Sequence, residues 1–171
     1  SLEVKPWELA GYSQVKVELD ELIINAGLRF DYFEPDFVVP IDLTQYHLET
    51  VLDPNTGSQI SNRKQADPTY QISPRLGVAF PISEDGVMRF SAGLFFQTPQ
   101  LNLLYTNNEF ERPEGADRYT IGNANLEPER TLQFEVGLQQ GLSETMGLDL
   151  TVFSKDIREL SGQTAVRGSI G

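Results

Sequence analysis

The chain has 171 residues, of which 39% are hydrophobic, and a mean hydropathy of −0.30, enough for one domain with a core. It contains no apolar run of the roughly 18 residues that a membrane helix needs, which excludes a helical membrane protein but not a membrane β-barrel. A net charge of −12 argues against nucleic acid as a partner, and zero cysteines exclude a disulfide framework or a thiolate metal site.

Six segments show the period-two alternation of apolar and polar residues that is typical of half-buried strands. They lie near residues 7–20, 22–33, 71–82, 87–98, 130–142 and 147–158. Ser83-Glu84-Asp85-Gly86 joins the central two segments, and we expect Gly86 to adopt the positive φ of a hairpin turn. The sequence therefore predicts three β-hairpins with strands of about ten residues.

The connections between these hairpins are long, whereas the links within them are short. Residues 34–69 and 99–129 connect successive hairpins, and the second connection contains a possible short helix near residues 101–105. The second face of each strand carries charged residues and glycine, which indicates a polar environment. Aromatic residues of the apolar face lie beside the long connections, namely Phe30, Tyr32 and Phe96, and Tyr70 enters a strand from one of these connections. Short turns, long loops, two-faced strands and an aromatic girdle are the signature of an outer-membrane barrel.

Three phrases carry a family resemblance. SPRLGVAFPISEDGVMRFSAGLFFQTP and NANLEPERTLQFEVGLQQGLS resemble the barrel region of TonB-dependent outer-membrane receptors, particularly the large receptors of Bacteroidetes-like bacteria. ELIINAGLRFDYF resembles an earlier strand pair of the same barrels, so the resemblance covers most of residues 7–158. It implies an all-β fold in which antiparallel β-hairpins form part of an outer-membrane β-barrel wall, with external loops at 34–69 and 99–129.

The resemblance also implies a function. The segment would supply barrel wall and ligand-facing loops to a bacterial outer-membrane receptor for energy-coupled uptake of a scarce nutrient, which could be an iron chelate, cobalamin, an oligosaccharide or a peptide. The implied partners are outer-membrane lipid, the receptor's own plug domain, the TonB energy-coupling complex and a small-molecule, glycan or peptide ligand. No cofactor, metal or nucleic acid is implied.

We expect residues 1–171 to be a fragment of such a barrel. The sequence shows no plug domain, signal peptide or energy-coupling segment, and whole receptors resemble barrels of about twenty-two strands. The competing interpretation is a soluble secreted β-sandwich that acts as a carbohydrate-binding or adhesion module. The sandwich explains the alternation and acidity, but it does not explain the pairing of short and long links.

Two groups of residues are candidates for function. The charged residues of the polar face could line a lumen and face the plug, or could form inter-strand ion pairs without a transport role: Arg29, Asp31, Arg75, Arg89 and Glu135. The second loop gathers aromatic, amide and guanidinium groups suited to a sugar or an organic chelate: Tyr105, Asn107, Asn108, Phe110, Arg112, Arg118 and Tyr119.

Enzymatic motifs are missing from the sequence. It has no Gly-x-Ser-x-Gly elbow, no His-Glu-x-x-His, no P-loop and no cysteine nucleophile, so we expect no enzyme activity. The single histidine, His47, stands alone in a loop, which favours a solvated side chain over a metal ligand. We interpret the segment from Asn123 to Arg130 as a structural turn that leads into the next strand, with ligand contact as the alternative.

Overall fold

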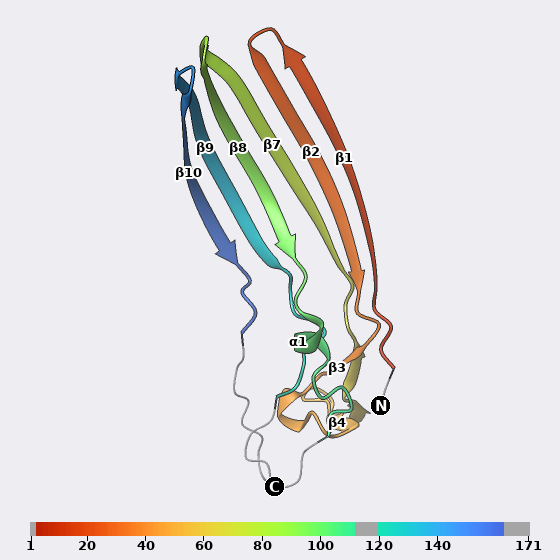
Figure 1. Ribbon diagram of the computed structural model, residues 1–171. Helices are drawn as coiled ribbons and strands as arrows, with labels where there is room; N and C mark the ends of the chain where they lie inside the picture. Colours follow the sequence, from red (N-terminus) through yellow and green to blue (C-terminus); the bar gives the residue numbers. More distant parts are fainter. Residues whose placement is uncertain (1–2, 112–119, 163–171) are drawn as a thin grey trace.

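The computed structural model describes residues 3–111 and 120–162, and its main feature is one long antiparallel sheet (Figure 1). Six strands follow one another in the order β1-β2-β7-β8-β9-β10. Their bounds are Trp7–Leu19, Leu22–Glu34, Thr69–Ser83, Gly86–Gln97, Glu129–Ser143 and Met146–Arg158. Each strand pairs with its sequence neighbour in the sheet, so the expected hairpins are present and the all-β class is confirmed.

The short turns and the long connections lie at opposite ends of the sheet. The three hairpin turns lie at one end, while the connections from β2 to β7 and from β8 to β9 lie at the other end (Figure 1). Gly86 does not adopt a positive φ, so that expectation is wrong. A Cβ atom there would lie 2.4 Å from Oε1 of Gln140 and 2.5 Å from Oγ of Ser83, so any larger residue would have to displace these two side-chain ends.

The register gives the sheet an apolar face. One row across three strands, for example, contains Phe90 of β8, Val136 of β9 and Val152 of β10. These side chains are 41%, 43% and 65% exposed, and β1 and β10 are exposed along their whole length. An apolar face this extensive is stable only when lipid or another apolar layer covers it.

The buried core of the chain lies outside the main sheet. Two small sheets form within the connection after β2: β3 (Val38–Pro40) pairs with β6 (Arg63–Gln65), and β4 (Thr50–Leu52) pairs with β5 (Gln59–Ser61). The predicted helix is confirmed as α1 (Leu101–Tyr105), and a 3-10 turn covers Leu43–Gln45. Buried side chains from both long connections pack as one cluster: Phe37, Val39, Tyr46, Ala66, Phe110 and Ala124. We call residues 35–68 and the described parts of 99–128 the loop body.

The small sheets lie at the end of the long strands and not across a face of the sheet (Figure 1). A β-sandwich needs two sheets packed face to face, about 10 Å apart. The described residues contain no second sheet of that kind, so the sandwich interpretation is wrong. Among those residues, no helix has both the length and the apolar character to cross a membrane.

Candidate functional site

The polar face of the sheet brings together all five charged candidates. The register places odd-numbered residues of β2, β7, β8 and β9 on the same face. Arg29, Asp31, Arg75, Arg89 and Glu135 therefore share it, although they come from four strands. The opposite, even-numbered face of these strands is the apolar one.

Most of these charges have partners within the sheet. Arg29 forms a forked pair with the carboxylate of Asp31 in the same strand, with Nε 2.8 Å from Oδ2 and Nη2 2.6 Å from Oδ1. Arg89 reaches two strands away, where its Nη2 lies 3.0 Å from Oδ2 of Asp149. Because the side chains of both pairs are exposed to solvent, these ion pairs contribute little to stability. Ion pairing does occur on this face, and the proposed contact with a plug stays a prediction.

Glycine makes room for the cross-strand pair. Gly137 lies directly between Arg89 and Thr151 in the register. A Cβ atom at Gly137 would lie 3.4 Å from Nε of Arg89, so the arginine side chain lies flat over the glycine. Glycines on this face thus let long cationic side chains lie along the wall instead of projecting from it.

The remaining two charges make other contacts. The guanidinium carbon of Arg75 lies 4.5 Å from the centroid of the Phe95 ring, a cation–π distance. Glu135 accepts hydrogen bonds from Oγ of Ser91, at 3.3 Å, and from Nε2 of Gln133. The polar face is therefore a network of local contacts and holds its charged groups in fixed orientations.

Some of the loop candidates pack inside the loop body, and others are accessible at its surface. Phe110 is only 5% exposed and packs in the loop body, with the guanidinium carbon of Arg63 4.4 Å from its ring centroid. Tyr105 donates a hydrogen bond to the carbonyl oxygen of Pro35 at 2.9 Å, and burial, aided by the charge of Asp36, raises the pKa of its hydroxyl. As folded here, both aromatic rings stabilise the loops, and a direct ligand contact stays a prediction.

The other loop candidates are more accessible or lie outside the structure. Asn107 and Asn108 are half-buried. The amide of Asn107 closes a turn with both backbone groups of Glu111, at 2.7 Å to the carbonyl oxygen and 3.2 Å to the N–H. Arg112, Arg118 and Tyr119 lie outside the described residues.

Asn62 organises the loop body, although no pattern in the sequence predicts this role. Its side chain is fully buried. Oδ1 accepts from the backbone N–H of Asp42 at 2.7 Å, and Nδ2 donates to the carbonyl oxygens of Gln45 at 2.9 Å and Leu48 at 3.2 Å. The neighbouring Arg63 also donates to the carbonyl of Leu48, and burial lowers the pKa of its guanidinium. One asparagine thus holds the segment 42–48 against the small sheets.

The phrase that precedes β9 connects the two long loops. Oδ1 of Asn125 accepts from the backbone N–H of Asp67, in the first connection, at 2.8 Å. Within the second connection, the N–H of Asn123 donates to the carbonyl of Leu103 at 2.9 Å. Ala124 is buried in the shared cluster. These contacts support the structural interpretation of the phrase.

Metal ligands do not converge in residues 3–111 and 120–162, where no group of three or more His, Asp or Glu side chains could hold an ion. His47 is exposed, with its ring edge-on to Tyr46 at a centroid distance of 5.4 Å. Asp42 caps the 3-10 turn, and hydrogen bonds from the hydroxyl and N–H of Thr44 lower the pKa of its carboxyl.

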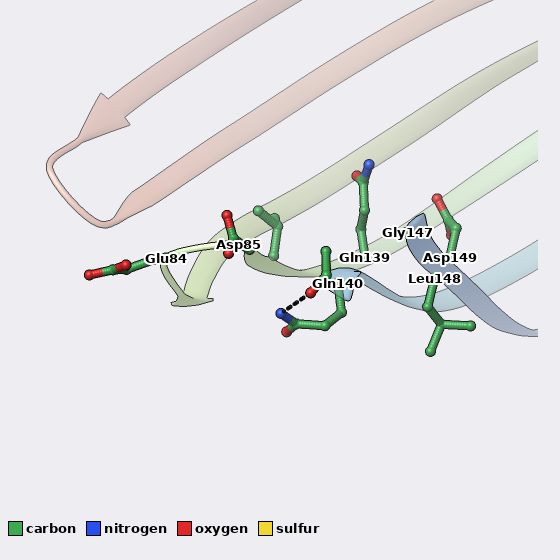
Figure 2. A pocket seen from close by; sticks show the side chains of 9 residues that line it. Glu84, Asp85, Gln139, Gln140, Gly147, Leu148 and Asp149 are labelled. Carbon is green, nitrogen blue, oxygen red and sulfur yellow. Dashed lines mark hydrogen bonds between the residues drawn. The ribbon is translucent and has the colours of Figure 1, made fainter. Parts of the chain in front are cut away.

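An open pocket lies at the short-turn end of the sheet (Figure 2). The β7–β8 turn and the turn end of the β9–β10 hairpin form it, and the N–H of Gly141 donates to the carbonyl of Asp85 at 2.8 Å. Its lining includes the carboxylates of Glu84, Asp85 and Asp149, the last of which pairs with Arg89. This arrangement ties two turns together and presents no converging set of groups for a ligand.

These features define the class of protein. The sheet is antiparallel and up-and-down, has one apolar and one polar face, and carries folded loops at one end. A sheet of this kind is a section of an outer-membrane barrel wall. The family description "TonB dependent receptor-like, beta-barrel" matches residues 3–170, and the chain belongs to that family. The family consists of outer-membrane receptors that transport their ligands, and not of enzymes.

One solved structure illustrates the shared fold. The chain is similar to the copper transporter OprC, with a TM-score of 0.55 and 13% sequence identity. The similarity covers 89% of this chain and 22% of that one, so the chain spans about a fifth of the length of its structural neighbour. The comparison with curated protein sequences gives no match.

Proposed function

We propose that this chain forms part of the wall and of the external loops of a bacterial outer-membrane receptor that takes up a scarce nutrient by energy coupling. The observation that carries this proposal is the two-faced sheet with its long, folded loops at one end and its short turns at the other. Family membership supports the same function. In the intact receptor, the partners would be outer-membrane lipid, a plug domain and the TonB complex.

The dimensions of the apolar face fit a membrane. From Leu22 to Tyr32, β2 spans ten residue steps, or about 34 Å at a rise of roughly 3.4 Å per residue. A strand tilt of about 40° reduces this length to roughly 26 Å along the membrane normal, close to the apolar band of outer-membrane barrels. Tyr32 and Trp7, whose ring centroids are 5.0 Å apart, lie at the loop end of this band, where an interfacial aromatic girdle belongs.

The loop body would contact the ligand from outside the membrane. Half-buried amide and aromatic groups, such as those of Asn107, Asn108 and Tyr105, suit an organic ligand with hydroxyl or carbonyl groups. Iron chelates, cobalamin, oligosaccharides and peptides all have such groups. The polar face, with Arg29, Asp31, Arg75, Arg89 and Glu135, would line the lumen and face the plug.

The experiment detects the parent protein in isolated outer membranes with an antibody to this segment, on gels with and without boiling. We expect a large band whose mobility shifts on boiling, because a closed barrel resists detergent unfolding. A small band in the soluble fraction, unchanged by boiling, would refute the receptor and favour a secreted module.

A matched pair of variants tests which face meets lipid. Val15 lies on the apolar face of β1 and is 55% exposed, whereas the adjacent Gln14 lies on the polar face. Val15→Arg should destabilise the barrel by about 2–4 kcal/mol, and Gln14→Arg by much less, because only the first places a charge in hydrocarbon. Equal effects on the temperature of the boiling-dependent shift would contradict the assignment of the faces.

A further inference from the structure

Two arginines lie side by side on the apolar face at its loop end. The register places Arg158 of β10 directly opposite Arg130 of β9, with Phe96 of β8 as the next residue in the same row. The next row toward the short turns contains Leu132 opposite Asp156. The two arginines therefore stand at the edge of the apolar band.

Such a pair needs a compensating anion. Residues directly opposite in an antiparallel pair have Cα atoms about 5 Å apart, and like charges there are destabilising. Asp156 supplies one carboxylate, but it is engaged by Arg158, with Nη2 2.6 Å and Nε 3.0 Å from Oδ2. Glu159, just after the strand, also interacts electrostatically with Arg158.

Arg130 lacks a comparable partner. Among residues 3–111 and 120–162, its guanidinium makes no hydrogen bond and no ion pair, and it interacts with Asp156 only at longer range. Its side chain is exposed. The site thus offers all the guanidinium N–H donors of Arg130, together with the N–H groups of Arg158 that do not bind Asp156.

The surroundings indicate what would bind. Toward the short turns, the same face continues with Leu132, Phe134, Val136 and Val152. At the loop end, the aromatic rings of Tyr32 and Tyr70 also lie on this face. A ligand that fits both parts has an anionic head at the arginines and apolar chains over the strands below.

We propose that Arg130 and Arg158 bind the phosphate group of an anionic lipid headgroup at the external edge of the apolar face. Guanidinium forks match phosphate oxygens in bidentate geometry, and Asp156 keeps Arg158 in position. The continuous apolar surface favours a lipid over free phosphate. This proposal rests on the proposed function, because it requires the apolar face to meet lipid.

The test uses the intact receptor that carries this chain, purified in detergent and stripped of lipid. Binding of fluorescent phosphatidylglycerol in mixed micelles is compared with binding of phosphatidylcholine, and inorganic phosphate is added as a competitor. We expect Arg130→Gln and Arg158→Gln each to weaken phosphatidylglycerol binding by about fivefold, the effect of one basic residue at an anionic lipid surface. Lys155→Gln is the matched control, because Lys155 lies on β10 but on the opposite face, beside the Phe153 ring.

Three results would overturn the lipid site: unchanged binding in the double Gln variant, equal loss in Lys155→Gln, or displacement of the probe by inorganic phosphate alone. If the double Gln variant does not fold, Arg130→Lys with Arg158→Lys keeps the charge, removes the fork and should still weaken binding. The boiling-dependent band shift is measured on every sample. Its absence from the unaltered receptor would refute the proposed function, whereas a normal shift with unchanged lipid binding would refute the lipid site alone.

Discussion

Replacing Asn62 by alanine should release one segment of the loop body without unfolding the sheet. The buried amide bonds the backbone N–H of Asp42 and the carbonyl oxygens of Gln45 and Leu48 at 2.7, 2.9 and 3.2 Å. Alanine would remove these three hydrogen bonds at a position closed to solvent. The N–H of Asp42 would lose its partner, whereas the carbonyls of Gln45 and Leu48 would keep only their bonds from the N–H of Leu48 and from Arg63. The main sheet does not use this side chain, so the strands should keep their pairing.

The contacts set the size of the effect. At about 1 kcal/mol of net stabilisation for each hydrogen bond, the loss of three amounts to about 3 kcal/mol for local opening. Backbone amides of residues 42–48 that exchange through local opening should then exchange with deuterium about a hundredfold faster. Hydrogen exchange followed by mass spectrometry of the corresponding peptide measures this ratio.

The control is Asn102→Ala, which removes an exposed asparagine from α1. It should leave the exchange of residues 42–48 unchanged, and neither variant should alter exchange in β2 or β7. Unchanged exchange in Asn62→Ala would refute the role of this side chain. Equal acceleration of the loop and of the strands would show that the loop body and the sheet unfold together, which contradicts the separation of their contacts.

Two further predictions concern the polar face and the 3-10 turn. Gly137→Val should displace the Arg89 side chain and abolish its coupling to Asp149, which we expect to be about 0.2–1 kcal/mol for an exposed pair. A double-mutant cycle of Arg89 and Asp149, read from the temperature of the band shift, measures this coupling energy. An unchanged coupling energy in the valine variant would contradict this geometry. Hydrogen bonds from Thr44 lower the folded-state pKa of Asp42 below its unfolded value, so their stabilisation is present above about pH 4 and is lost as the pH falls through the folded pKa. Protection of residues 42–48 should therefore fall only in acid, and it should fall less steeply in Asp42→Asn; equal pH profiles would contradict the assignment.

The strands could be predicted because their signal is local. The alternation of Leu76, Val78 and Phe80 with small and polar residues predicts one strand of a hairpin and both of its faces, and the structure confirms this hairpin. The bounds differ by a few residues, as at β7, which begins at Thr69 instead of near residue 71. Alternation says nothing about the residue at which pairing stops.

The loop body could not be predicted because its contacts are distant in sequence. Asp67 and Asn125 are 58 residues apart, and Pro35 and Tyr105 are 70 residues apart. Phe110, in a polar segment, has the sequence context of an exposed binding residue, but its burial depends on partners that come from the other loop. Gly86 shows a related limit, because the side chains that crowd this turn glycine, Gln140 and Ser83, cannot be identified from the turn sequence alone.

The shared core of the two loops has a consequence for how such receptors can change their ligand. Because Phe37 of the first loop packs on Tyr105 and Phe110 of the second, neither loop has a complete interior alone. A chimera that exchanges only one of them would place a foreign surface against half of a core. New specificity would then be acquired by transferring both loops as a pair, or by substitutions confined to their exposed side chains.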